Sequence, residues 1–227
     1  TAAKLETWLC ESEQCKLIYI AALMGRGKTD LALSFLAVVS HYYERAREAV
    51  KRMDGADEST VPVPELAANF KVQTPDDAPA VRQISDFDTL AEWGAQGDSS
   101  DVRWFIFDEA STELTAQSGS NAQDVAEVMA PFVKKMRKMG INMIVIGHDK
   151  GDVHPAIRSL ADYVDKRGLK SASFYSGINN REGVGHLFDA QQIPPVSDAG
   201  WEFDTDDLAA WPWGPARDGV NAAEGSA

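Results

Sequence analysis

The amino-acid sequence predicts an α/β fold in which a mainly parallel central sheet is flanked by helices. Three short apolar runs, over residues 16–21, 102–107 and 141–146, have the composition of strands that are buried on both faces. Helical patterns cover residues 28–50, soon after the first run, and 122–139, directly before the third. Strands that alternate with helices in this order are typical of a parallel sheet.

The chain is acidic. It has 227 residues, of which 44% are hydrophobic, so one globular domain of ordinary size is expected. Its formal net charge of −13 argues against a broad nucleic-acid-binding surface, because such surfaces need Lys and Arg to neutralise phosphates. A small basic site on an acidic body is compatible with this charge. Sparse lysine with abundant Asp, Glu and Ala also favours a high-salt cytoplasm, where screening weakens self-repulsion.

The sequence favours a cytoplasmic location. No stretch approaches the roughly 18 uninterrupted apolar residues of a membrane-spanning helix, and no signal-peptide pattern is present. Cys10 and Cys15 are expected to be ordinary thiols, because one pair lacks the two further ligands of a structural zinc site.

We expect three parts along the chain: an N-terminal segment over 1–15, the main domain over 16–192 and a C-terminal extension over 193–227. The end of the extension is expected to be disordered, whereas Trp201, Trp211 and Trp213 attach its start to the body. The minor elements expected are a loop over 53–68, a strand over 69–74, helices over 87–93 and 153–160, and a hairpin formed by 172–175 and 185–188.

A glycine-rich segment joins the first apolar run to the long helix. It matches the last three positions of the phosphate-loop template G-x-x-x-x-G-K-[ST], with Ala22 in place of the first glycine. Lys28 would bridge the β- and γ-phosphates of ATP, and the Thr29 hydroxyl would ligate Mg²⁺. The alternative is a glycine turn with a capping Thr. The candidate nucleotide-binding residues are Ala22, Leu23, Met24, Gly25, Arg26, Gly27, Lys28, Thr29 and Asp30.

Two carboxylates, Asp108 and Glu109, end the second apolar run. Such a pair is typical of a Walker B site, where the first carboxylate orients the Mg²⁺ shell and the second accepts a proton from the attacking water. Acids also commonly end strands without any catalytic role. With a phosphate loop 79 residues earlier, we favour the functional interpretation, with Asp108 as a metal ligand and Glu109 as a catalytic residue.

His148 follows the third apolar run, at a position suited to sensing the γ-phosphate. With Asp149, Asp152 and His154 it could instead form a metal site. For Asp152 we favour a third interpretation, as the cap of a helix that begins at Val153.

Four basic residues fall within five positions, over residues 134–138. Cations near the end of a helix complement its dipole and stay solvated, which is the simplest interpretation. The cluster is nevertheless a candidate either for a catalytic arginine that acts on a neighbouring subunit, Arg137, or for a local DNA contact. Arg26 and Arg158 are weaker candidates for that arginine.

Three segments together resemble the zonula occludens toxin-like branch of the FtsK/HerA P-loop ATPases: 25–29, 105–110 and 137–149, followed by an Asp-x-x-x-x-Ile-Arg pattern over 152–158. This resemblance, which covers about residues 16–170, implies a RecA-like fold and ATP-driven movement of double-stranded DNA, usually by a ring of subunits. With the acidic composition, it points to a virus or plasmid of a halophilic archaeon, and to the host cytoplasm for a viral protein.

The sequence therefore predicts Mg²⁺-dependent ATP hydrolysis coupled to DNA translocation, in viral genome packaging or mobile-element DNA processing. The expected partners are further copies of the chain and double-stranded DNA, with no membrane segment. Two alternatives remain open at this point. One is a kinase acting on a nucleotide or another small molecule, and the other is a nucleotide-gated adaptor with little hydrolysis.

Overall fold

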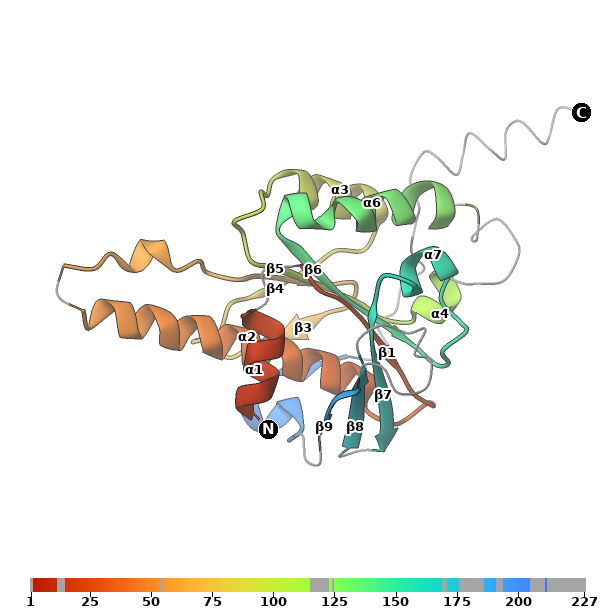
Figure 1. The fold of residues 1–227 in the computed structure, drawn as a ribbon, viewed down its shortest axis with the longest axis horizontal. Coiled ribbons are helices and arrows are strands. Elements are labelled where there is room, and N and C mark those ends of the chain that lie inside the picture. The colour runs from red at the N-terminus through yellow and green to blue at the C-terminus, as the bar shows by residue number, and fades with distance from the viewer. Residues whose placement is uncertain are drawn as a thin grey trace, which may run out of the picture.

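The computed structural model describes residues 2–11, 15–53, 55–114, 123, 125–168, 171–175, 186–190, 194–204 and 211. An eight-stranded sheet runs through the centre of this part in the order β4-β2-β5-β6-β1-β7-β8-β9 (Figure 1). Every neighbouring pair from β4 to β7 is parallel, and β7, β8 and β9 continue as antiparallel neighbours. The expected fold class is confirmed. The strands of this sheet are β1 (Leu17–Ala21), β2 (Glu65–Ala68), β4 (Val81–Gln83), β5 (Arg103–Phe107), β6 (Ile141–Gly147), β7 (Asp162–Gly168), β8 (Ser171–Tyr175) and β9 (His186–Ala190).

Helices cover both faces of the sheet (Figure 1). On one face lie α1 (Ala2–Cys10) and α2 (Lys28–Lys51), whose outer half extends beyond the sheet. On the other face lie α3 (Phe87–Ala95), α4 (Ala110–Glu113), α6 (Ala130–Lys135) and α7 (Pro155–Arg158). A π-helical turn η2 (Val125–Met129) precedes α6, and a 3₁₀ turn η3 (Met136–Met139) follows it. Shorter pieces are the 3₁₀ turns η1 (Glu58–Thr60) and η4 (Val196–Ala199) and an antiparallel pair of β3 (Val72–Gln73) and β10 (Glu202–Phe203).

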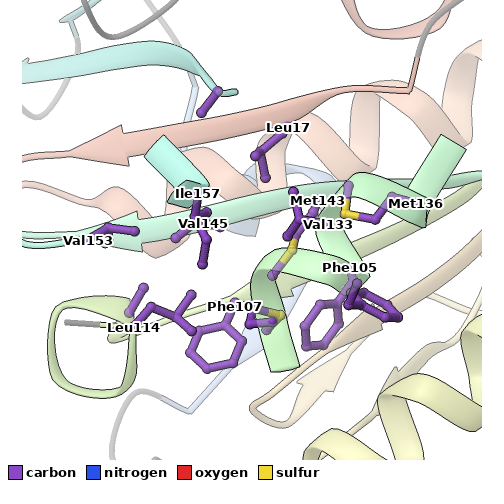
Figure 2. Packing of buried hydrophobic residues seen from close by; sticks show 14 of the residues in the cluster. Leu17, Phe105, Phe107, Leu114, Val133, Met136, Met143, Val145, Val153 and Ile157 are labelled. Carbon is purple, nitrogen blue, oxygen red and sulfur yellow. The ribbon is translucent and has the colours of Figure 1, made fainter. Parts of the chain in front are cut away.

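Alternation along the strands builds two cores. Tyr19 of β1 faces the α6 side, whereas Ile18 and Ile20 face the α2 side, and all three are at most 1% exposed. Burial of a large apolar side chain contributes roughly 1.5–3 kcal/mol. On the α6 side, Phe105 and Phe107 of β5 pack with apolar residues of β6 and α6 (Figure 2).

Strand register places the functional segments at one edge of the sheet. Ala21, the last residue of β1, pairs with Gly147 of β6 on one side and with Asp165 of β7 on the other. Phe107, the last residue of β5, pairs with Val145 of β6. The carboxyl ends of these parallel strands therefore meet, which is where open α/β sheets bind their ligands.

Several expectations about minor elements were wrong. The stretch expected to be a loop over 53–68 contains β2, because Glu65–Ala68 pairs with β5 and β4 although it lacks β-branched residues. The strand expected over 69–74 is reduced to β3, and β4 and β7 were not predicted. The helix expected over 153–160 is only α7, and its cap is His154, whose Nδ1 accepts from Ala156 N at 3.2 Å.

The chain on either side of the expected main domain packs against it. Leu5 and Leu9 of α1 are buried in the core on the α2 side. Trp201 and Trp211 are each 2% exposed, as expected for residues that attach the C-terminal extension, while Trp213 lies outside the described residues. Among the residues that the structure describes, no helix combines the length and apolarity needed to cross a membrane.

Candidate active site

The candidate phosphate loop connects β1 to α2 and contains two glycines in the left-handed conformation. Gly25 has φ +73° and Gly27 has φ +72°, a backbone region that side chains with a Cβ rarely adopt. Ala22, which replaces the first glycine of the template, does not have a positive φ and is compatible with its position. Leu23 and Met24 at the tip are 69% and 84% exposed.

Lys28 is the first residue of α2, and its ammonium group points back into the loop. Its Nζ donates a hydrogen bond to the carbonyl of Ala22 at 2.9 Å and lies 3.0 Å from Nδ1 of His148. Burial lowers the pKa of Lys28, while the carboxylates of Glu109 and Asp108 oppose that shift. The ammonium group is therefore held at the carboxyl edge of the sheet, close to the acids that follow β5.

Thr29 and Asp108 come together from α2 and β5. The hydroxyl Oγ1 of Thr29 donates to Oδ2 of Asp108 at 2.6 Å. Asp108 is buried, and this burial raises the pKa of its carboxyl group, while hydrogen bonds from Thr29 and from the Glu109 amide act in the opposite direction. A hydroxyl and a carboxylate side by side at a phosphate loop match the oxygen ligands that Mg²⁺ prefers, so these two residues fit the metal.

Glu109 has an unusual backbone conformation. Its φ is +54°, and it is the only non-glycine residue with a positive φ in the described part of the chain. The left-handed conformation costs an ordinary residue roughly 1–2 kcal/mol. Its carboxylate Oε2 lies 3.1 Å from Nε2 of His148. The turn after Asp108 therefore directs the Glu109 carboxylate toward the residue that follows β6.

His148 stands between Lys28 and Glu109. An ammonium group only donates hydrogen bonds, so Nδ1 of His148 acts as the acceptor toward Lys28. Its Nε2 then carries a proton and donates to Glu109. One imidazole ring thus links the phosphate-loop lysine to the candidate water-activating carboxylate.

Asp152 holds the turn that carries His148. Its Oδ2 accepts from the backbone amides of His148 at 3.2 Å and Asp149 at 2.7 Å. The expectation that Asp152 caps the following helix was therefore wrong, because its carboxylate is directed to the preceding turn. Tyr19 strengthens the same turn by donating its hydroxyl to the carbonyl of Asp149. Arg158 lies nearby and donates to the carbonyl of Lys150 at 3.0 Å.

Asn69, directly after β2, is a site residue that the sequence analysis missed. It is 9% exposed, and its side chain accepts from the Asp108 amide at 2.7 Å and donates to the Asp108 carbonyl at 3.0 Å. A polar residue at the end of a strand is a signal for this role. That signal was hidden because the strand was expected to begin at Asn69 rather than to end before it.

Two of the predicted site residues point elsewhere. The carboxylate of Asp30 accepts from the Val196 amide at 2.9 Å, which joins α2 to the C-terminal extension. Arg137 lies in η3, just before β6 begins, whereas the phosphate loop follows the end of β1. Since β1 and β6 are parallel, Arg137 sits at the opposite edge of the sheet from the site in its own chain.

Two hollows in the surface differ in their relation to this site. One, of about 460 Å³, adjoins the phosphate loop and is lined by Ala22, Leu23, Arg26, His148, Asp149, Lys150, Asp165 and Lys166, among others. A larger one, of about 560 Å³, follows the outer half of α2, where Tyr43 and Trp201 line it. The 460 Å³ hollow shares His148 and the loop residues Ala22, Leu23 and Arg26 with the cluster described above, so it adjoins the candidate site, whereas the larger hollow shares none of these residues.

No family model matches the sequence, and no curated protein matches it. Solved structures similar to this chain include the N-terminal domain of zonular occludens toxin from Neisseria meningitidis, with 14% identity and a TM-score of 0.44 over 85% of this chain and 94% of that one. The genome packaging NTPase B204 from Sulfolobus turreted icosahedral virus 2, in complex with ATP-gammaS, has 13% identity and a TM-score of 0.43 over 80% and 98%.

The pCW3 conjugation coupling protein TcpA with ATPgS has 9% identity and a TM-score of 0.43 over 80% of this chain and 61% of that one. The expected resemblance to zonula occludens toxin-like proteins is confirmed. The structure itself shows the expected fold class, a mainly parallel sheet flanked by helices, with a glycine-rich loop between β1 and α2.

Proposed function

We propose that this protein is a Mg²⁺-dependent ATPase. The observation that carries the proposal is the meeting of five side chains from three elements: Lys28 and Thr29 at the start of α2, Asp108 and Glu109 after β5, and His148 after β6. Each of these side chains is of a type that phosphoryl transfer to water uses.

The residues of the loop and of α2 bind the polyphosphate. Gly25 and Gly27, both in the left-handed conformation, directly precede the start of α2, whose dipole favours negative charge there. The Lys28 ammonium group neutralises charge that develops on the phosphates. The adjoining hollow of about 460 Å³ provides space for the rest of the nucleotide.

Thr29 and Asp108 would hold Mg²⁺, which when bound neutralises phosphate charge and orients the phosphates. Glu109 would accept a proton from the attacking water, as its half-exposed carboxylate at the edge of the site allows. His148 keeps that carboxylate in place through Nε2 and contacts the Lys28 ammonium group through Nδ1, so it would respond to phosphate binding at Lys28. The protein thus supplies phosphate binding, a metal site and a base within one cluster.

The test uses one variant that should lose nucleotide binding and one that should keep it. Lys28→Ala should lose both nucleotide binding and hydrolysis, because the phosphates lose their main cation. Glu109→Gln should retain binding, measured with a fluorescent ATP analogue, but hydrolyse about 100-fold or more slowly. Hydrolysis at the wild-type rate in both variants would refute the proposal.

We further propose that hydrolysis drives movement of double-stranded DNA, in viral genome packaging or mobile-element DNA processing. The support is the sequence resemblance together with the basic cluster, defined as Lys134, Lys135, Arg137 and Lys138. All four side chains are exposed, and none forms an ion pair with any residue that the structure describes. Some cations elsewhere on this acidic surface are paired, as in Arg45–Glu6 at 2.8 Å and Lys51–Glu58 at 3.0 Å, whereas the basic cluster places four cations, unpaired within the described part of the chain, in five positions.

The translocation proposal is tested by ATP hydrolysis with and without double-stranded DNA, in buffers from dilute to molar KCl, with mass measured in the same buffers. DNA-stimulated hydrolysis by an oligomer is expected. ADP release that depends on a small phosphate acceptor would support a kinase instead. Binding of ATP with no single-turnover hydrolysis would support a nucleotide-gated adaptor.

A further inference from the structure

The backbone at Asp108 is held by a side chain rather than by a strand. The last backbone hydrogen bond between β2 and β5 runs from Asn69 N to Ile106 O at 3.0 Å. Beyond that point the Asn69 amide replaces the missing strand: Oδ1 accepts from Asp108 N at 2.7 Å and Nδ2 donates to Asp108 O at 3.0 Å. Both peptide groups that flank the Asp108 Cα are therefore fixed by one buried side chain.

This anchorage bears directly on the strained residue that follows. The Asp108 carbonyl belongs to the peptide group that joins Asp108 to Glu109, so its orientation limits the φ of Glu109. The other side of that peptide group is also held, because Glu109 N donates to Oδ1 of Asp108 at 2.8 Å. A positive φ at a non-glycine residue persists only where its surroundings enforce it.

We propose that Asn69 is a positioning residue for hydrolysis, which keeps Glu109 in its left-handed conformation and its carboxylate at His148. This inference rests on the proposed ATPase function. Only an amide side chain presents an acceptor and a donor that can pair with both groups of one residue in this way. Asn69 itself lies outside the direct contacts of the Lys28–His148–Glu109 chain, so it acts through the backbone of Asp108.

The protein contains a matched control. Asn142, near the start of β6, makes the same kind of double contact at the opposite edge of the sheet. Its Oδ1 accepts from Lys16 N at 2.7 Å, and its Nδ2 donates to Arg103 O at 3.1 Å. Loss of either amide removes two hydrogen bonds to the backbone, but only Asn69 adjoins the candidate catalytic residues.

The experiment compares Asn69→Ala and Asn142→Ala in the full chain, by steady-state ATP hydrolysis, binding of a fluorescent ATP analogue without Mg²⁺, and thermal unfolding. For Asn69→Ala we expect kcat to fall about 10- to 100-fold, because small displacements of catalytic groups have effects of this size. The nucleotide Kd should stay within about twofold, since Lys28 keeps its hydrogen bond to Ala22. Asn142→Ala should lose thermal stability but keep kcat.

Equal losses of kcat in the two variants, or an unchanged kcat in Asn69→Ala, would overturn the role of Asn69 while leaving the ATPase proposal intact. Absence of hydrolysis in the wild type would overturn both. If Asn69→Ala does not fold, Asn69→Ser serves instead, because its hydroxyl keeps a polar group at the buried position but is too short to replace both contacts with Asp108. Its kcat should then lie below that of Asn142→Ala, and an equal kcat would refute the proposal.

Discussion

The Nζ of Lys28 lies 3.0 Å from Nδ1 of His148, so the phosphate-loop lysine contacts the residue that ends the neighbouring strand β6. The same ring reaches Glu109 through Nε2 at 3.1 Å. A ligand that binds Lys28 therefore changes the surroundings of Glu109 through one imidazole. This connection gives the site a direct route from phosphate binding to the candidate base.

Substitution of His148 tests that connection. His148→Ala removes both contacts, and we expect kcat to fall about 100-fold while nucleotide binding persists. His148→Gln should retain a substantial part of the activity, because a side-chain amide can accept from Lys28 and donate to Glu109. Equal activity of the Ala and Gln variants, measured by ATP turnover, would show that the two contacts do not matter.

The pH range in which kcat/KM is high should be narrower than the range that Asp and Lys side chains with ordinary pKa values would give. Asp108 acts when ionised. Because burial raises its pKa, activity should be lost on acidification at a pH above the usual pKa range of Asp. Lys28 acts when protonated, and because burial lowers its pKa, activity should be lost at a pH below the usual range of Lys. Lys28→Arg should move the alkaline limb upward, since guanidinium stays protonated. An alkaline limb that stays in place in this variant would assign it to another group.

Asp108→Asn should stabilise the fold while abolishing hydrolysis. Burial raises the folded-state pKa of Asp108, so its ionised form destabilises the protein above that pKa, and the effect disappears as the pH falls below it. We expect a gain on the order of 1 kcal/mol in the free energy of unfolding at pH 7, which shrinks on acidification. Thermal unfolding at several pH values measures it. A loss of stability at pH 7 would contradict the prediction.

Arg137 is proposed to act on a neighbouring subunit, because its own site lies at the other edge of the sheet. Arg137→Ala alone should reduce hydrolysis strongly. A mixture of Arg137→Ala with Lys28→Ala should regain activity, since one protomer supplies the phosphate loop and the other the arginine. The matched control is Lys138→Ala, which should remain active. No recovery in the mixture, with oligomers verified by mass, would exclude a role between subunits.

The basic cluster is proposed to contact DNA phosphates. Replacing Lys134, Lys135, Arg137 and Lys138 by Ala should reduce the slope of log K against log salt by about 3 to 4, since each phosphate contact contributes about 0.9. The control replaces Arg45, Arg47, Lys51 and Arg52, which are ion-paired on α2. A similar change of slope in both variants would point to net charge rather than to a contact surface.

Much of the site was accessible from the sequence. The candidate phosphate loop and the Asp108–Glu109 pair each follow a short apolar run. Such runs predict buried strands without knowledge of the strands that pair with them. The position of His148 followed from the same pattern. In contrast, β2 and β4 were missed or misplaced, because their short polar or alanine-rich sequences become strands only by pairing with β5 and with each other.

By itself the sequence determined the α/β class and identified the candidate phosphate loop and the two carboxylates, because these depend on residue types at short spacing. Only the tertiary structure decided that β6 lies between β1 and β5, and hence that His148 stands between Lys28 and Glu109. It also decided that Asn69 holds Asp108 and that Arg137 lies at the opposite end of the parallel strands from the candidate site. These relations depend on how distant strands pair, which is settled by shared burial and hydrogen bonding rather than by any local pattern.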